Sequence, residues 1–358
     1  MIYLALVFTQ RCNARCRHCA VREFRPEDQD MPLEDAFRYI DQAAALSKKE
    51  GDPFSIGFSG GEPFLRYPDL VAAIRYAKEK GAAQVSCVTN GFWGKDAAMA
   101  RQWATELRNS GLVYISFSLD DFHQEYIPLD SVLSAFTACR KVGLRLVVKS
   151  VVTCRTRRLP EVLRDLGNLL LTNYITIQEL ACVPAGKVAN RIPKDEWLMQ
   201  EGIPQEPCPG MGLLAILPNG TTYPCCGVGW TQQLVVGNAL AEPIADLLAR
   251  SRNGALSAIL ADRGPAFFVP YFAVAGYPLP QEGYVNSCHL CMTVLGHPEI
   301  ERILPTALAD WKIKQVEKCL GGFWKPDDVD YTELRALAGA EGRDVQARGG
   351  TPSSDGLK

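Results

Sequence analysis

The sequence has no long apolar run, no excess of charge and no secretory signal, and each absence excludes a class of protein. No run approaches the roughly 18 uninterrupted apolar residues that predict a transmembrane helix. The 38 Lys and Arg nearly balance the 40 Asp and Glu, giving a net charge of −2. This balance argues against a nucleic-acid partner, which requires a basic face. The apolar start, 1–8, lacks the basic region and cleavage site of a signal peptide.

Cysteine is the residue in excess, with 13 among 358 residues. An odd number of cysteines excludes complete disulfide pairing within the chain. Because no secretory signal is visible, we expect a cytoplasmic, reducing location, where grouped cysteines predict metal sites or catalytic thiols. The apolar share of 47% is that of a globular protein, and the length predicts about two domains.

Short apolar runs alternate with amphipathic stretches over the first half of the chain. The expected strands are 2–8, 54–58, 84–88, 112–118, 144–152 and 174–180. The expected helices are 32–47, 67–80, 95–109, 131–141 and 159–171. Six such alternations predict an α/β fold with a parallel sheet, as a partial or complete barrel. In such folds the functional residues gather at the carboxyl ends of the strands.

The second half has a different character. A proline-rich stretch, 184–209, is predicted as a linker, and Pro218-Asn219-Gly220 predicts a hairpin between 213–217 and 221–223. Helices are expected over 240–261 and 304–320, with an irregular stretch over 264–283. The last residues, 339–358, are rich in Gly, Ser and charge and are predicted to be disordered.

Three cysteines, Cys12, Cys16 and Cys19, fall directly after the first expected strand. Thiolates this close can converge on one metal centre, and both zinc and iron–sulfur clusters prefer thiolate ligands. With no fourth cysteine nearby, a cluster would keep one iron open to an outside ligand. A zinc site completed by His18, or buried structural cysteines, are the alternatives. Flanking arginines favour an anionic centre: Arg11, Arg15 and Arg17.

A second motif, Gly60-Gly61-Glu62-Pro63, stands after the second expected strand. Glycines allow the backbone to approach a ligand closely, and the Glu62 carboxylate can hold an ammonium group. The CxxxCxxC spacing, followed at this distance by GGEP, resembles the radical SAM superfamily. The position of His18 is often aromatic in that family.

The resemblance covers roughly 1–185 and implies a partial (βα)6 barrel. It implies a [4Fe–4S] cluster on Cys12, Cys16 and Cys19, with S-adenosylmethionine (SAM) on the fourth iron and its amine at the GGEP motif. Reduction by an electron donor such as flavodoxin or ferredoxin would cleave SAM to a 5′-deoxyadenosyl radical, which abstracts a substrate hydrogen.

Further SAM contacts are expected where the third and fourth strands end, at Asn90, Ser118 and Asp120. Asp120 is assigned to the ribose hydroxyls, with the start of a turn as the alternative. His123, on the same loop, is expected either to touch substrate or to be solvated.

Four later cysteines form two pairs, Cys208 with Cys225 and Cys288 with Cys291. Four thiolates can close a tetrahedral site, and a zinc ribbon is the first interpretation. The hairpin and CxxC also resemble the SPASM/twitch extension of radical SAM enzymes, which implies an auxiliary cluster. Because 292–299 contains no cysteine, we expect one auxiliary [4Fe–4S] cluster. The expected regions are the barrel 1–185, a linker 186–207, a twitch-like domain 208–300, a helical segment 301–338 and the tail 339–358.

Cys225 is followed by Cys226, and successive side chains of an extended segment point apart. If Cys225 ligates the auxiliary cluster, Cys226 is a thiol that can give a hydrogen atom to a substrate radical. The alternatives are that Cys226 is merely buried or is itself the ligand. Cys154 and Cys182 are rival donors, and Cys319 is expected to be buried in the last helix, with a distant extra ligand as the alternative.

The resemblance leaves three reactions open: epimerisation, dehydrogenation through the auxiliary cluster, and thioether or C–C crosslinking. We favour epimerisation of a peptide or natural product, with Cys226 as hydrogen donor. Because the chain starts at the first strand, no fused leader-recognition domain is expected. A non-catalytic zinc-binding structural protein is the alternative of another class.

Overall fold

The computed structural model describes residues 1–20, 29–167, 175–185, 188–225 and 231–320. In these ranges nine strands form one sheet in the order β6-β5-β4-β3-β2-β1-β7-β8-β9. The six strands from β6 to β1 pair in parallel, which confirms the predicted α/β architecture. The strands are β1 (Ile2–Thr9), β2 (Phe54–Gly60), β3 (Gln84–Thr89), β4 (Tyr114–Ser118), β5 (Arg145–Val152), β6 (Ile175–Ala181), β7 (Met211–Ile216), β8 (Thr221–Cys225) and β9 (Gly237–Asn238).

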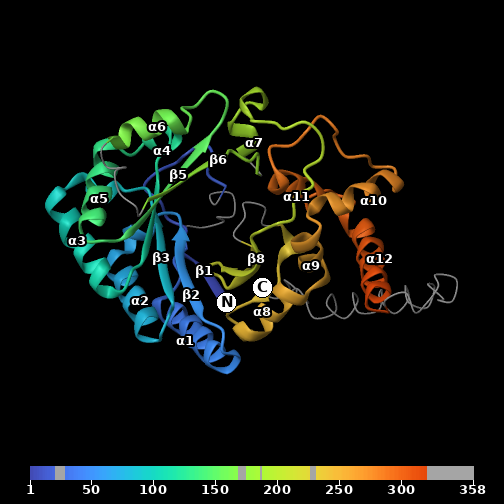
Figure 1. The fold of residues 1–358 in the computed structure, drawn as a ribbon, viewed down its shortest axis with the longest axis horizontal. Helices are drawn as coiled ribbons and strands as arrows, with labels where there is room; N and C mark the ends of the chain where they lie inside the picture. The colour runs from blue at the N-terminus through green and yellow to red at the C-terminus, as the bar shows by residue number, and fades with distance from the viewer. Residues whose placement is uncertain (21–28, 168–174, 186–187, 226–230, 321–358) are drawn as a thin grey trace, which may run out of the picture.

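Helices connect the parallel strands and lie along the outer side of the curved sheet (Figure 1). They are α1 (Leu33–Glu50), η2 (Pro63–Arg66), α2 (Tyr67–Glu79), η3 (Phe92–Lys95), α3 (Ala97–Ser110), α4 (Asp121–Gln124), α5 (Leu129–Lys141) and α6 (Leu159–Leu166). Local sequence sets their ends. For α3, the Asp96 carboxylate accepts from the backbone N–H groups of Ala98 and Met99, and Gly111 adopts the left-handed conformation that ends the helix.

The predicted hairpin is present, and it belongs to the same sheet as the parallel strands. β7 pairs in parallel with β1, with Leu4 opposite Leu214, and β8 returns antiparallel to β7. β1 is therefore hydrogen-bonded on both sides, to β2 and to β7. Its mostly buried residues fit a strand covered on both faces.

The C-terminal helices differ from the sequence-based expectation. The single helix expected over 240–261 is two helices, because Gly254 between them is extended, with φ −61° and ψ 136°. Proline in the first turn starts two short helices inside the stretch expected to be irregular, 264–283. Cys319 is exposed, so its expected burial is wrong. The helices here are α7 (Val188–Arg191), η5 (Lys194–Glu196), η6 (Gln232–Leu234), α8 (Ile244–Asn253), α9 (Ala255–Asp262), η7 (Pro265–Phe268), α10 (Val269–Val274), α11 (Ser287–Leu295) and α12 (Ile300–Leu320).

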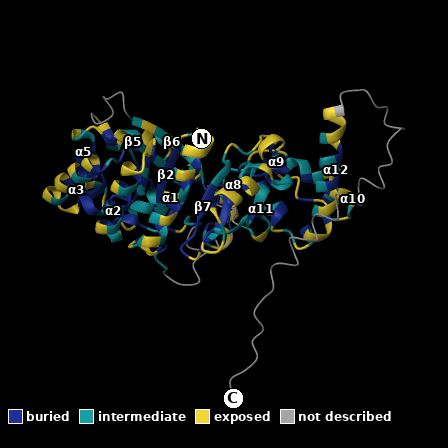
Figure 2. Ribbon diagram, turned by 90° about the horizontal axis from the view of Figure 1, so that it is seen from below, coloured by how far each residue is buried: buried dark blue, intermediate teal, exposed yellow. Residues whose placement is uncertain are grey.

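Apolar side chains form two large cores and one small one. The first lies between the parallel sheet and its helices, and the second joins β7 and β8 to α9–α12. Figure 2 shows exposed residues on the outer surfaces of both parts and buried residues between the elements. A small third core, around Cys16, Phe122 and Cys182, lies among the loops that follow the strands. Among the described residues, no helix has the length and hydropathy needed to cross a membrane.

Candidate functional site

The loop cysteines, Cys12, Cys16 and Cys19, come together directly after β1. Cys16 is buried, and its carbonyl accepts a hydrogen bond from the Cys19 N–H at 3.2 Å. Burial, followed by the charges of Cys19, Asp120 and Cys12, raises the pKa of the Cys16 thiol well above its ordinary value. Thiolate at this position therefore requires a compensating positive charge, which a bound metal centre supplies.

The GGEP loop is clamped against the backbone just before Cys12. The Gly61 N–H donates to Thr9 O at 2.7 Å, and the Glu62 N–H donates to Arg11 O at 2.8 Å. A Cβ on Gly61 would overlap the Arg11 carbonyl. Gly60 has φ +130°, a conformation that other residues rarely adopt. Glycine is thus required because this loop and the cysteine loop approach backbone to backbone.

Glu62 is 1% exposed, and its carboxylate joins two loops. Oε1 accepts from Phe64 N at 3.1 Å and Thr89 Oγ1 at 3.0 Å, and Oε2 accepts from Asn90 N at 2.6 Å. Burial raises the pKa of Glu62 to about 7, although these hydrogen bonds oppose the rise. A carboxylate has about four acceptor positions, so one remains for an ammonium donor. The expected role of Glu62 toward SAM stays a prediction.

Asn90 extends this network to the cysteine loop. Its amide nitrogen donates to Asn13 Oδ1 at 2.8 Å, and its own oxygen accepts from Phe92 N at 3.1 Å. Asn13 follows Cys12 directly. The end of β3, the GGEP loop and the cysteine loop therefore form one hydrogen-bonded unit, which the sequence alone did not indicate.

Asp120 is 1% exposed and caps α4. Its carboxylate accepts from His123 N at 3.0 Å and Val151 N at 3.1 Å, and both oxygens lie within 3.0 Å of His123 Nδ1. These contacts match the alternative in which Asp120 starts a turn, and they occupy much of the carboxylate assigned to the ribose. Ser118, also assigned to SAM, is half-buried at the end of β4.

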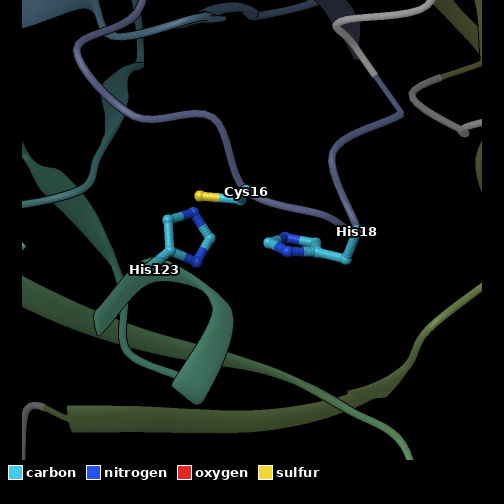
Figure 3. Close-up of side chains that lie close together, drawn as sticks. All are labelled: Cys16, His18 and His123. Carbon is cyan, nitrogen blue, oxygen red and sulfur yellow. The ribbon is translucent and has the colours of Figure 1, made fainter. Parts of the chain in front are cut away.

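His18 and His123 meet beside Cys16, as Figure 3 shows. One ring nitrogen of each histidine and the Cys16 sulfur all lie within 4.8 Å of one another. The His18 ring packs against Phe122 and His123, with ring centroids 4.9 and 4.8 Å apart. His123 is far from Cys16 in sequence, and only the fold brings the two together.

Two arginines near the cysteine loop are paired with acids. Arg11 pairs with Asp30 at 2.5 Å, and Arg17 pairs with Glu125 at 3.1 Å. The carboxylates therefore partly neutralise the positive charge of Arg11 and Arg17, which acts less strongly on the thiols. Arg191, which the sequence did not single out, donates to the Cys19 carbonyl at 3.1 Å.

The distal cysteines, Cys208, Cys225, Cys288 and Cys291, also come together. Burial and then the charges of Cys225, Cys288 and Cys208 raise the pKa of Cys291 well above its ordinary value. Cys225 ends β8, the CxxC pair lies on α11, and the Cys208 N–H donates to Leu260 O at 2.8 Å. Cys226 lies outside the described residues.

The spacing of the sulfur atoms bears on which metal centre fits. Four thiolates around one zinc ion lie about 3.8 Å apart, from a Zn–S bond of about 2.3 Å in tetrahedral geometry. Among the described residues, neither the loop cysteines nor any three distal cysteines have all their sulfur atoms within 4.8 Å of one another. Both groups offer the thiol ligands that zinc and iron–sulfur clusters share, so the cysteines alone do not choose between these centres.

The structure combines a parallel α/β sheet, three thiols on its first loop and a Gly-Gly-Glu-Pro loop held against that loop. This combination defines a class of cofactor-dependent proteins. Residues 6–174 match the family model of the radical SAM superfamily. The chain therefore carries a radical SAM domain, which implies a [4Fe–4S] cluster and SAM.

Curated relatives match part of the chain. The putative peptide biosynthesis protein YydG of Bacillus subtilis is 24% identical over 60% of this chain and 66% of its own length. GTP 3′,8-cyclase 2 of Pseudomonas aeruginosa is 27% identical over 52% of this chain and 56% of its length. GTP 3′,8-cyclase of Campylobacter curvus is 31% identical over 42% and 46%. The matches thus span about half to two thirds of these relatives.

A solved structure, native anSMEcpe with bound AdoMet, has a similar fold. It superposes with a TM-score of 0.55 at 14% identity, covering 86% of this chain and 99% of that one. A second structure of the same protein, with AdoMet and the Kp18Cys peptide, gives the same score and coverage. At this identity the likeness concerns the fold alone.

Proposed function

We propose that this chain is a radical SAM enzyme that acts on a peptide or related natural product and epimerises a carbon centre. The observation that carries the proposal is the unit formed by the loop cysteines and the GGEP loop. Its three thiols match a cluster with one open iron, and the clamped backbone leaves an acceptor on Glu62 for the SAM ammonium.

When bound, the reduced cluster supplies the electron that cleaves SAM to methionine and a 5′-deoxyadenosyl radical, which removes one hydrogen atom from the substrate. The protein residues hold the reactants. The hydrogen bond between Asn90 and Asn13 joins the end of β3 to the cysteine loop, and Glu62 joins the GGEP loop to Asn90. Buried Phe122 limits water beside Cys16. An electron donor such as flavodoxin or ferredoxin is required.

A peptide substrate is supported by one curated relative. YydG is described as a putative peptide biosynthesis protein, whereas anSMEcpe, solved with a bound peptide, shares the fold alone with this chain. Neither resemblance identifies the residue that this chain would modify. A small natural product is the remaining candidate.

For epimerisation we assign the hydrogen donor to Cys226. Cys225 is buried and electrostatically coupled to Cys291, which supports Cys225 as the auxiliary ligand and leaves the next thiol available. The Cys226 S–H bond would break, its hydrogen atom would join the substrate radical, and one electron from the reductant with one proton from solvent would restore the thiol. An auxiliary cluster beside Cys225 would provide a route for that electron.

Cys182 is the rival donor that the described residues support best. It belongs to the small core that contains Cys16. Burial, with a contribution from the charge of Asp120, raises the pKa of Cys182 to about 12, which keeps hydrogen on the sulfur at neutral pH. Cys154, in contrast, is exposed and donates to Asp195 O. Crosslinking and dehydrogenation are the competing reactions.

The test uses reconstituted enzyme with SAM, reductant and a candidate peptide in deuterated water. Epimerisation predicts a product one mass unit heavier, because deuterium from the exchanged thiol enters the carbon. Cys226→Ala should still form 5′-deoxyadenosine but yield no deuterated product, whereas the matched variant Cys154→Ala should behave as wild type. A product two mass units lighter without deuterium would refute epimerisation and favour crosslinking or dehydrogenation. If Cys182→Ala is the one variant that fails to incorporate deuterium, Cys182 rather than Cys226 is the hydrogen donor.

A further inference from the structure

The buried ring nitrogen of His18 has no hydrogen-bond partner among the described residues. Its Nδ1 atom is shielded from solvent, and the ring packs against Phe122 and His123. An unsatisfied buried polar atom destabilises the folded state, so native proteins rarely keep one without a reason. A group bound beside the atom is a common reason.

The neighbouring groups narrow the choice of partner. His123 Nδ1 faces the Asp120 carboxylate at 2.9 and 3.0 Å, so Asp120 holds that side of the second imidazole. Phe122 offers no hydrogen-bonding atom. Arg191, whose charge also acts on His18, offers only N–H donors, whereas the Cys16 sulfur can accept, and one ring nitrogen of His18 lies within 4.8 Å of that sulfur (Figure 3).

The distal cysteines provide an internal comparison. His289 stands between Cys288 and Cys291, much as His18 stands between Cys16 and Cys19. The Nδ1 atom of His289 accepts a hydrogen bond from Val285 N at 3.2 Å and is therefore satisfied by the protein itself. The two histidines therefore differ in one respect. Of the two, only His18 has a buried ring nitrogen that remains for a ligand.

We propose that His18 donates an N–H hydrogen bond to a sulfur of the SAM-binding cluster, at Cys16 or the adjacent sulfide, and thereby raises the reduction potential of that cluster. This inference rests on the proposed function, because it requires the cluster. A donor at sulfur stabilises the additional negative charge of the reduced state. His18 would thus be a tuning residue that widens the range of electron donors able to reduce the cluster.

The experiment is a redox titration of the reconstituted full chain, followed by electron paramagnetic resonance of the signal that changes on SAM addition. His18→Phe keeps an aromatic ring and removes the donor, whereas His18→Gln keeps an N–H group. At fixed ambient potential we expect His18→Phe to show an about tenfold lower ratio of reduced to oxidised cluster, a shift of about 59 mV to more negative potential. His18→Gln should lie closer to wild type, and the control His289→Phe should leave this signal unchanged.

A second measurement does not depend on the variants. Wild-type protein labelled with ¹⁵N-histidine should show weak nitrogen coupling to the reduced cluster, together with one exchangeable proton. Absence of both couplings, or equal potentials in wild type and His18→Phe, overturns the inference. Strong coupling with iron loss in both His18 variants also overturns it, by making His18 an iron ligand. If wild type shows no SAM-responsive signal, the proposed function itself fails, which is a distinguishable result.

Discussion

The loop cysteines and the distal cysteines differ in how the chain assembles them. The first three lie on one short loop after β1, fixed by backbone hydrogen bonds to the GGEP loop. The other four come from the segment before β7, the end of β8 and helix α11, and they meet only when the second core packs. The first group is therefore mainly a property of local sequence, and the second is a property of tertiary structure. Perturbations should separate the two.

Removal of a single loop cysteine should have the largest effect. We expect Cys16→Ala to abolish 5′-deoxyadenosine formation and to reduce iron from about eight to about four per chain, if both clusters are present. Cys291→Ala should lose a similar amount of iron yet still cleave SAM, without productive turnover. Iron analysis and chromatography of 5′-deoxyadenosine measure both. Equal loss of SAM cleavage in the two variants would mean that the groups are not independent.

A methyl group on Gly61 tests the backbone clamp that positions the loop cysteines. The added Cβ would overlap the Arg11 carbonyl, so Gly61→Ala should lower the free energy of unfolding by about 3 kcal/mol and displace the loop. Gly81 is the control for an added Cβ that meets no other atom, because nothing lies within 4 Å of the position that a Cβ would take, although its φ of +89° adds a backbone cost that Gly61 does not carry. Gly81→Ala should therefore cost about 1 kcal/mol through its backbone alone. Urea denaturation and iron content measure the two; a Gly61 variant as mild as the control would show that the clamp yields easily.

Truncation in the second core should affect the distal cysteines selectively. Leu290, between Cys288 and Cys291, is fully buried, and Leu290→Ala should cost about 3 kcal/mol. Because the distal cysteines depend on this packing, Leu290→Ala should lose the iron that these cysteines bind, while SAM cleavage persists. Leu107→Ala in the first core removes an equally buried leucine and should leave distal iron intact. Equal loss of distal iron in the two variants would show that the second core does not selectively support the distal cysteines.

The smallest expected effect is the pH dependence of SAM binding, which should follow the ionisation of Glu62. Its native pKa of about 7 exceeds the ordinary value of 4.5, so between these values the native state binds more protons than the unfolded state. This group's contribution to stability is therefore largest below pH 4.5 and is lost as pH rises through 7. A cationic ligand favours the ionised form, so SAM affinity should increase about fivefold from about pH 6 to about pH 7.5, above which the SAM amine loses its own proton. Glu62→Gln should abolish that slope in calorimetric titrations.

Much of the fold followed from local sequence. The six parallel strands and their helices were predictable because apolar runs, amphipathic periods and capping residues such as Asp96 and Gly111 all favour the same elements. The break at Gly254 was not predictable, because glycine inside an amphipathic stretch is compatible with either a helix or a kink. The hairpin was predicted, but its pairing with β1 depends on contacts that no local pattern records.

The candidate site shows the same division. The cysteine spacing and GGEP predicted where SAM chemistry would lie, and the glycines are explained by the close approach of two backbones. The proximity of His123 to Cys16 and the hydrogen bond from Asn90 to Asn13 could not be predicted, because each joins residues from different loops. The assignments of Ser118, Asp120 and Cys226 stay predictions.

The pairing of β1 with β7 has a consequence for how the protein is made. Leu4 can pair with Leu214 only after the whole parallel sheet has emerged from the ribosome, so one edge of β1 carries unpaired backbone groups until then. Such long-range pairings form late and slow folding. We therefore expect nascent chains that end before the hairpin to aggregate or recruit chaperones, since the strand that leads into the cysteine loop is completed only by the last strands synthesised.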